Sequence, residues 1–159
     1  MREQLVQLGG GAHVLAIQIL GNVDDAADAV HDAFIAVLSR PDAYDHRLGP
    51  LKPWFMRVVR NRCIDMLRRR RDSNMPVEEI IDSRVGPEEA LVNAQRTLAI
   101  KNALAAMDSE KREIVILRDY LDLSYAEIAD VLGIAPGTVM SRLHRARLVL
   151  KEVLNSDGK

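Results

Sequence analysis

Aromatic residues and cysteine are scarce in this chain of 159 residues, and its net charge is close to zero. Aromatic side chains make up only 4% of it, yet apolar residues together reach 48%, which is enough to bury a core. Leu, Ala, Val, Ile, Arg, Asp and Glu dominate, and this composition favours helices over sheets. The single cysteine, Cys63, excludes an internal disulfide and a cysteine-rich zinc site.

Long apolar runs are also missing. No stretch reaches the ~18 apolar residues of a membrane span, and no basic-then-apolar leader opens the chain. We therefore expect a cytoplasmic protein with no membrane insertion of its own. The sequence has no Gly-rich phosphate loop, metal-ligand cluster or nucleophile–base pair. We accordingly predict no catalytic residues, no cofactor and no metal site, and we interpret the chain as a non-enzyme.

Basic and acidic residues nearly balance, giving a net charge of −1, but they are unevenly distributed. Residues 52–71 contain eight Lys or Arg and one acid, Asp65, whereas residues 72–90 contain six acids and one base. A strongly cationic helix is typical of nucleic-acid binding. The near-zero net charge of the whole chain therefore does not exclude a nucleic-acid partner.

Turn and capping residues divide the chain into short helices. Gly21-Asn22 ends an apolar helix at 12–20, and Pro41 limits the next, which runs from Asp24 to about Ser39. We expect a loop at 41–52 and further helices at 53–71, 87–107, 109–120, 125–132 and 136–150. The prediction is an all-α protein of two small helical domains, 1–71 and 91–159, joined by an acidic flexible linker at 72–90.

Residues 124–150 have the pattern of a helix-turn-helix. Ser124 and Glu127 form a capping box, Gly133 provides the turn, and Pro136 begins the second helix. An apolar stripe on that helix must be buried, namely Val139, Leu143, Ala146 and Leu150. We predict that DNA meets the other side, with Ser141, His144 and Arg145 near base edges, Arg142 and Arg147 near phosphates, and Thr138 and Met140 flanking them. A tight helical hairpin with solvated basic residues is the alternative interpretation.

The 53–71 helix has two different faces. Its inner face is predicted to contain Phe55, Val59, Cys63 and Met66, so Cys63 is interpreted as a core residue rather than a reactive thiol. Its outer face contains Arg57, Arg60, Asn61, Ile64 and Arg68. Cations hold phosphates, and an amide or an apolar side chain can meet an exposed base, so this face suits single-stranded or distorted DNA. A solvated basic face without a ligand remains the alternative.

The 24–38 helix is also two-sided. Its predicted inward residues are Ala26, Ala27, Val30, Phe34 and Val37, and its outer stripe is Asp28, His31, Asp32 and Ile35. An exposed isoleucine among acids indicates a protein contact, although isolated exposed apolar residues are common. A metal site at His31 and its Asp neighbours is a weaker alternative, because no second set of ligands accompanies them.

The chain resembles the extracytoplasmic-function (ECF) sigma factors. The segment GNVDDAADAVHDAFIAVL, followed by YDHRLGPLKPWFMRVVRNRCIDMLRRRR, is similar to their second conserved region. The segment LRDYLDLSYAEIADVLGIAPGTVMSRLHRARLVL is similar to their fourth. The resemblance implies a two-domain, all-helical protein that binds core RNA polymerase and directs it to particular promoter DNA. It also implies an anti-sigma factor that covers both domains.

The resemblance implies a role for each predicted surface. The clamp helices of the largest polymerase subunit would bind Asp28, His31, Asp32 and Ile35. The −10 promoter element would be captured and separated by the loop from Tyr44 to Pro53 and by Arg57, Arg60, Asn61 and Arg68. The helix at 136–147 would read the −35 element in the major groove, and the linker at 72–90 would extend toward the polymerase active-site channel.

Some residues depart from the family pattern, and alternatives from other classes stay open. His31 stands where Gln is usual, and Met140 stands where Lys or Arg is usual, which removes one −35 contact. One alternative is a sigma-mimicking protein that sequesters an anti-sigma factor without binding DNA, and such a mimic should have lost the basic face of helix 53–71. Another is a helix-turn-helix regulator that works without polymerase, which has no use for the motifs of the first domain.

Overall fold

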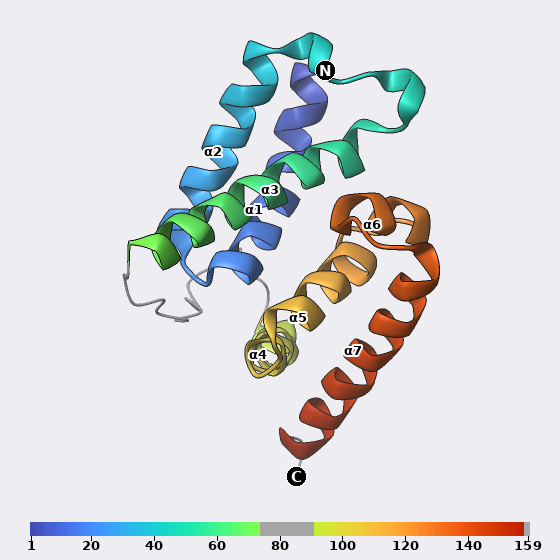
Figure 1. Cartoon of the computed structure of the whole chain (residues 1–159). Coiled ribbons are helices and arrows are strands. Elements are labelled where there is room, and N and C mark those ends of the chain that lie inside the picture. Colours follow the sequence, from blue (N-terminus) through green and yellow to red (C-terminus); the bar gives the residue numbers. More distant parts are fainter. Residues whose placement is uncertain (74–90, 158–159) are drawn as a thin grey trace.

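The computed structural model describes residues 1–73 and 91–157, and within them it contains helices and turns but no strand (Figure 1). The predicted all-α fold is thereby confirmed. A first bundle contains α1 (Arg2–Leu20), α2 (Val23–Ser39) and α3 (Leu51–Asp72). A second group contains α4 (Leu91–Ala105), α5 (Ser109–Val115), α6 (Tyr125–Leu132) and α7 (Pro136–Asp157). The predicted linker lies outside the described residues, apart from its first two positions.

Capping residues separate α1 from α2 as predicted. Gly21 adopts the left-handed conformation, with φ of 73°, and its N–H donates to the Ile17 carbonyl at 2.7 Å. Glycine reaches this conformation without a steric penalty, so it ends α1. The Asn22 side chain then accepts from the Asp25 N–H at 3.1 Å and begins α2.

Helix α1 is longer than predicted, because it begins at Arg2 rather than near residue 12. Three consecutive glycines lower the helix propensity of its first half, so the sequence pattern did not predict a helix there. Leu5 is only 1% exposed and anchors the early turns in the core. A Cβ at Gly11 would lie 2.6 Å from Leu121 Cδ2, so glycine permits a close approach at that point. Tertiary packing here outweighs helix propensity.

The first bundle packs around aliphatic side chains and the aromatic pair of Phe34 and Phe55. Phe55 of α3 is fully buried, and its ring centroid lies 5.1 Å from that of Phe34 on α2. Val59 and Cys63 follow on the same buried face, and Met66 packs against it while partly exposed. The predicted inner face of α3 is therefore confirmed.

The predicted inward face of α2 is wrong at one position, Ala27, which is exposed. The buried stripe runs from Ala26 through Ala29 and Ala33 to Val37, in steps of three and four residues. Ala27 lies about 100° around the helix from Ala26, and its side chain falls on the exposed side.

In the second group, side-chain caps also begin the helices. Asp108 accepts from the Lys111 N–H at 3.0 Å at the start of α5. At the start of α6, the Glu127 N–H donates to the Ser124 hydroxyl at 3.1 Å, and the Ser124 N–H donates to the Glu127 carboxylate at 2.8 Å. Gly133 ends α6 in the left-handed conformation, and α7 begins at Pro136 as predicted.

The helix predicted at 109–120 is not α-helical throughout. It is α-helical to Val115 and continues as a π-helical turn, η3 (Ile116–Tyr120). Within η3, the Arg118 guanidinium donates to the Leu123 carbonyl at 2.8 Å and lies 5.2 Å from the centre of the Tyr125 ring. These contacts hold the turn against the start of α6, which no local pattern in the sequence indicated.

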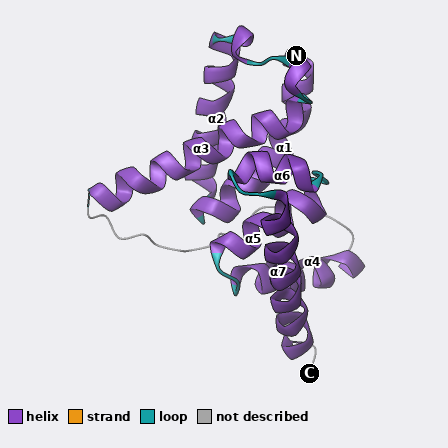
Figure 2. Cartoon of the chain, turned by 45° about the vertical axis from the view of Figure 1, so that its right-hand side comes forward, coloured by secondary structure: helices purple, strands orange, loops and turns teal. Residues whose placement is uncertain are grey.

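The two helix groups lie against each other, as both views show (Figures 1 and 2). Helix α6 packs on α3, and α5 packs on α1. The buried side chains of both groups form one continuous core cluster. Among the described residues, no helix has both the length and the apolar content that crossing a bilayer requires.

We expect Cys63 to be unreactive toward Ellman's reagent in the native protein at neutral pH. The residue is fully buried, and burial raises the pKa of its thiol to about 12, so almost none of it is the nucleophilic thiolate. The measurement is thiol release with and without urea. Rapid stoichiometric reaction without urea would contradict the interpretation of Cys63 as a core residue.

Candidate nucleic-acid interface

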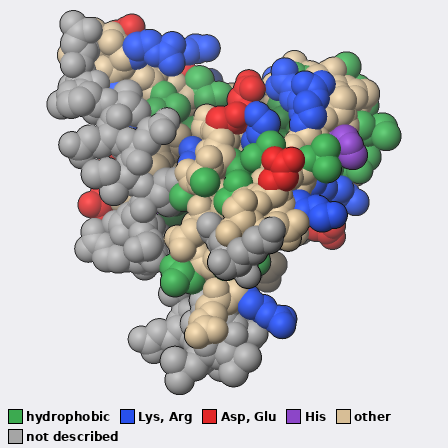
Figure 3. All heavy atoms as spheres, turned by 90° about the horizontal axis from the view of Figure 1, so that it is seen from below, with side chains coloured by type: hydrophobic (Ala, Val, Ile, Leu, Met, Phe, Trp, Pro, Cys, Tyr) green, Lys and Arg blue, Asp and Glu red, His purple; other side chains and the backbone are tan. Residues whose placement is uncertain are grey.

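Helix α7 presents the predicted DNA-contact side chains at the surface. Its inward stripe of Val139, Leu143 and Ala146 is buried, and Leu150 packs partly buried beside it. The opposite side exposes Ser141, His144 and Arg145, together with Met140, and leaves Thr138 and Arg142 half-buried. Figure 3 shows Lys and Arg side chains gathered with a histidine on the side of the molecule where α6 and α7 lie.

Ser141 and Arg147, two of the side chains predicted to meet DNA, have partners within the protein. The Ser141 hydroxyl lies 3.2 Å from the Thr138 carbonyl, to which it donates. Arg147 forms an ion pair with Asp119 of η3, with Nη2 2.6 Å from Oδ1. Because both side chains are nearly half exposed, this pair is weak and can exchange for a phosphate. Asp119 was not singled out by the sequence pattern.

The outer face of α3 is divided between solvent and the second helix group. Arg57, Asn61 and Arg68 are exposed, as predicted, whereas Ile64 is half-buried. Arg60 is different, because its Nε donates to the carboxylate of Glu113 on α5. The structure thus keeps most of the predicted −10 face open and places Arg60 in a contact between the two groups.

Glu113 is a site residue that the sequence analysis missed. Its side chain is only 10% exposed, and burial raises the pKa of its carboxyl, although the Arg60 guanidinium opposes that shift. The one signal in the sequence is an acid directly before the apolar run IVIL. That signal indicates a half-buried acid, but it does not identify a partner 53 positions away.

The two predicted DNA surfaces meet at a small cavity. Arg60 of α3 and Arg142 of α7 both line this space of about 30 Å³, together with Glu110, Glu113, Ile114 and Leu132. The −10 and −35 surfaces assigned from the sequence therefore lie side by side in this structure.

The loop before α3 is shaped by its own contacts. The Tyr44 ring lies 5.0 Å from the Trp54 ring, and its hydroxyl donates to the Gly49 carbonyl at 2.7 Å. Leu48, at the tip of this loop, is 88% exposed. Tyr44 is consequently half-buried and helps to hold the loop, while Leu48 is open to a ligand.

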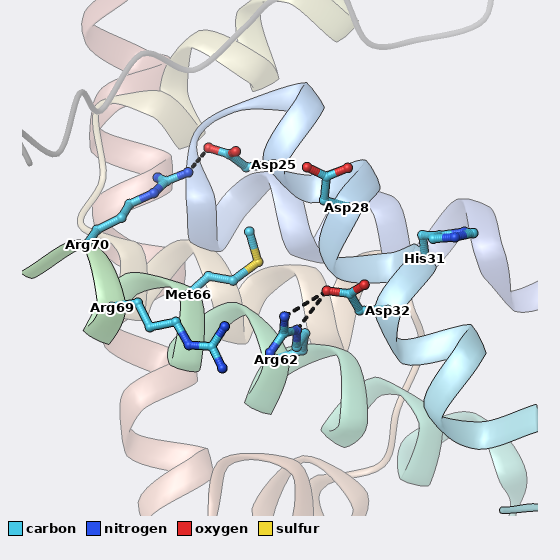
Figure 4. Close-up of a pocket in the computed structure, with 8 residues that line it drawn as sticks. All are labelled: Asp25, Asp28, His31, Asp32, Arg62, Met66, Arg69 and Arg70. Carbon is cyan, nitrogen blue, oxygen red and sulfur yellow. Dashed lines mark hydrogen bonds and ion pairs between the residues drawn. The ribbon is translucent and has the colours of Figure 1, made fainter. Parts of the chain in front are cut away.

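The acidic stripe of α2 borders a groove against α3 (Figure 4). Its lining residues are Asp25, Asp28, His31 and Asp32 of α2 and Arg62, Met66, Arg69 and Arg70 of α3. Arg62 donates to Asp32 at 2.8 Å, and Arg70 pairs with Asp25, so ion pairs join the two helices along the groove. Asp28, His31 and Ile35 are exposed, so this face of α2 is both charged and apolar and is open to solvent.

Sequence comparison identifies relatives of both helix groups. Residues 8–73 match the family model for sigma-70 region 2, and residues 97–150 match the model for sigma-70 region 4. The ECF RNA polymerase sigma factor SigL of Mycobacterium tuberculosis is 35% identical over 146 residues, which cover 87% of this chain and 81% of that protein. SigW of Bacillus subtilis, another ECF sigma factor, is 29% identical over 152 residues and is covered to 81% of its length.

Structural comparison extends this likeness to the arrangement of the helices. The sigma factor RpoE from Bartonella quintana, crystallised in complex with the anti-sigma factor NepR, superposes with a TM-score of 0.81 at 26% identity. The match covers 98% of this chain and 97% of that one, so both helix groups and their relative placement are similar. With sigma-70 regions 2 and 4 in order along one chain, the protein belongs to the family of ECF RNA polymerase sigma factors.

Proposed function

We propose that this chain binds core RNA polymerase through the outer face of α2 and directs it to promoters recognised by α3 and α7. The observation that carries the proposal is an exposed cationic face on α3 and an exposed recognition side on α7 of the same chain. The first suits unpaired DNA and the second suits the major groove. The cationic face of α3 would have no role in a regulator that recognises only duplex DNA.

The proposal divides the chain into region 2 at 1–71, a linker at 72–90 and region 4 at 91–159. Region 2 supplies polymerase contacts at Asp28, His31, Asp32 and Ile35, and −10 contacts at Tyr44, Arg57, Arg60, Asn61 and Arg68. Region 4 supplies −35 contacts at Thr138, Met140, Ser141, Arg142, His144 and Arg145.

The proposed partners include an anti-sigma factor as well as polymerase and promoter DNA. The support is that a sigma factor similar over 98% of this chain was crystallised with one. The chain would act in the cytoplasm, where it adds specificity to the polymerase and performs no catalysis of its own.

The experiment that tests the function is run-off transcription from a randomised promoter library, with core polymerase alone and with this protein. We expect transcripts that depend on the protein and share spaced −35 and −10 motifs. If the folded protein bound core polymerase and yielded no such transcripts, the sigma-mimicking alternative would be favoured.

We expect Arg145→Ala to weaken −35 recognition by about 1–3 kcal/mol, because an exposed arginine on the recognition helix is placed to read a base edge. The measurement compares transcription from promoters that differ only in the −35 element. Lys151→Ala, which removes an exposed charge further along α7, is the matched control. An equal loss on every −35 sequence would make Arg145 a phosphate contact.

A further inference from the structure

The side chain of Met140 is an apolar group at the surface of the proposed recognition helix. It is 60% exposed and lies near the N-terminal end of α7. The adjacent Val139 belongs to the buried stripe, and one residue turns the helix by about 100°, so Met140 points away from the core. Its apolar surface is therefore available to be buried against a ligand, which would be favourable because it removes that surface from water.

The first two turns of α7 carry no Lys or Arg on the side of Met140. Within residues 136–144, Arg142 is the single Lys or Arg. It lies two residues after Met140, about 200° around the helix, and it lines the small cavity beside Glu113. One turn before Met140, Gly137 has nothing within 4 Å of the point where a Cβ would stand. The surface around Met140 is thus open to the close approach of a ligand, and it lacks the cation that a phosphate would require.

The major groove of DNA offers one apolar group, the C5 methyl of thymine, beside its hydrogen-bond donors and acceptors. A thioether has no donor and is only a weak acceptor, so Met140 cannot hydrogen-bond a guanine edge as an arginine can. The unbranched methionine side chain has three rotatable bonds, which let it adjust to the position of a methyl group. Among the four bases, thymine is therefore the one that suits Met140.

We propose that Met140 determines part of the promoter specificity by packing against the C5 methyl of a thymine in the −35 element. This inference rests on the proposed function, which places α7 in the major groove, and it names the base that one side chain selects. The N-terminal residues of a recognition helix are those that contact base edges, and Met140 lies among them. The open surface at Gly137 lets the groove edge approach from the same side.

A methyl contact and a charge contact respond differently to salt. Packing against a methyl group releases no counterion, so the preference for thymine should be the same at low and high salt. A lysine at position 140 would instead pair with a phosphate, and log K would fall more steeply with log salt, by about 0.9 in slope. The salt dependence of binding therefore separates the two kinds of contact.

The test measures binding of the full chain with core polymerase to duplexes selected by binding from a randomised pool. Each thymidine of the −35 element is replaced in turn by deoxyuridine, which lacks the methyl group and keeps the same hydrogen-bonding groups. The variants are Met140→Leu, which stays apolar, and Met140→Lys. Leu148→Lys is the matched control, because it makes the same kind of change at a 49% exposed position about 12 Å further along α7.

We expect deoxyuridine at one −35 position to weaken binding of the wild-type protein about fourfold, the factor that burying one methyl group gives. Met140→Leu should keep most of this preference. Met140→Lys should bind the thymidine and deoxyuridine duplexes equally and show the steeper salt dependence. Leu148→Lys should retain the fourfold preference. Because Met140 is exposed, none of these results should be accompanied by a loss of folded protein.

Two results would overturn the methyl contact. One is equal binding of thymidine and deoxyuridine duplexes by the wild-type protein at every −35 position. The other is a fourfold preference that survives in Met140→Lys, because another side chain would then meet the methyl group. Transcription from the same duplexes tests the proposed function separately. Transcripts without any methyl preference would support that function and overturn the contact, whereas a methyl preference without transcripts would support the contact and contradict the function.

Discussion

Alanine at both Arg57 and Arg60 is expected to lower open-complex formation about a hundredfold at physiological salt while leaving core binding unchanged. A hydrogen bond to a charged group contributes roughly 1.5–3 kcal/mol; at the low end of that range, two losses add to about 3 kcal/mol, which is a factor of about a hundred. Both residues lie on the outer face of α3, away from the exposed stripe of α2. The measurements are permanganate footprinting of the melted promoter and binding of fluorescently labelled core polymerase.

The matched control is Arg40→Ala with Arg96→Ala, which removes the same charge from exposed positions outside α3. Arg60→Ala also breaks the ion pair with Glu113, so the single variants Arg57→Ala and Arg60→Ala are measured beside the double variant. Unchanged open-complex formation by the Arg57 and Arg60 double variant would show that this face of α3 does not contact the promoter. A loss of core binding would show that α3 takes part in the polymerase interface.

Phe55→Ala is expected to destabilise the protein by about 3–5 kcal/mol, a large part of the 5–15 kcal/mol that holds most native folds. The ring is fully buried and pairs with Phe34, so its removal leaves a cavity in the core. The measurement is the urea midpoint of unfolding followed by circular dichroism.

The control for this substitution is Val6→Ala, which truncates a 71% exposed side chain on α1 and should change the free energy of unfolding by less than about 0.5 kcal/mol. If Phe55→Ala unfolded at the wild-type urea concentration, the core of the first bundle would have to lie elsewhere.

Most helix boundaries were predictable because the forces that set them act within one helical turn. The Ser124–Glu127 capping box and the Asp108 cap each join residues three positions apart, so both are legible in the sequence. The same holds for the buried stripe of α7, since a step of three or four residues returns to the same face. Ala27 shows the limit of this reasoning, because one residue of phase error moves a side chain from the core to solvent.

The start of α1 was missed for a different reason. Glycine lowers helix propensity wherever it stands, and the sequence does not show what a missing Cβ allows to approach. Only the packed chain shows that Leu121 occupies the space beside Gly11. The π-helical turn at Ile116–Tyr120 is similar, since its contacts with Leu123 and Tyr125 form only after the chain has turned back on itself.

By itself, the sequence determined that the chain is helical, which faces of α2, α3 and α7 are polar, and that segments matching sigma-70 regions 2 and 4 occur in order. These properties follow from composition, periodicity and capping, all of which are local. The tertiary structure alone decided that Arg60 meets Glu113 and that Gly11 meets Leu121. These contacts join residues far apart in sequence, and such residues meet only where the packing of the whole chain brings their surfaces together.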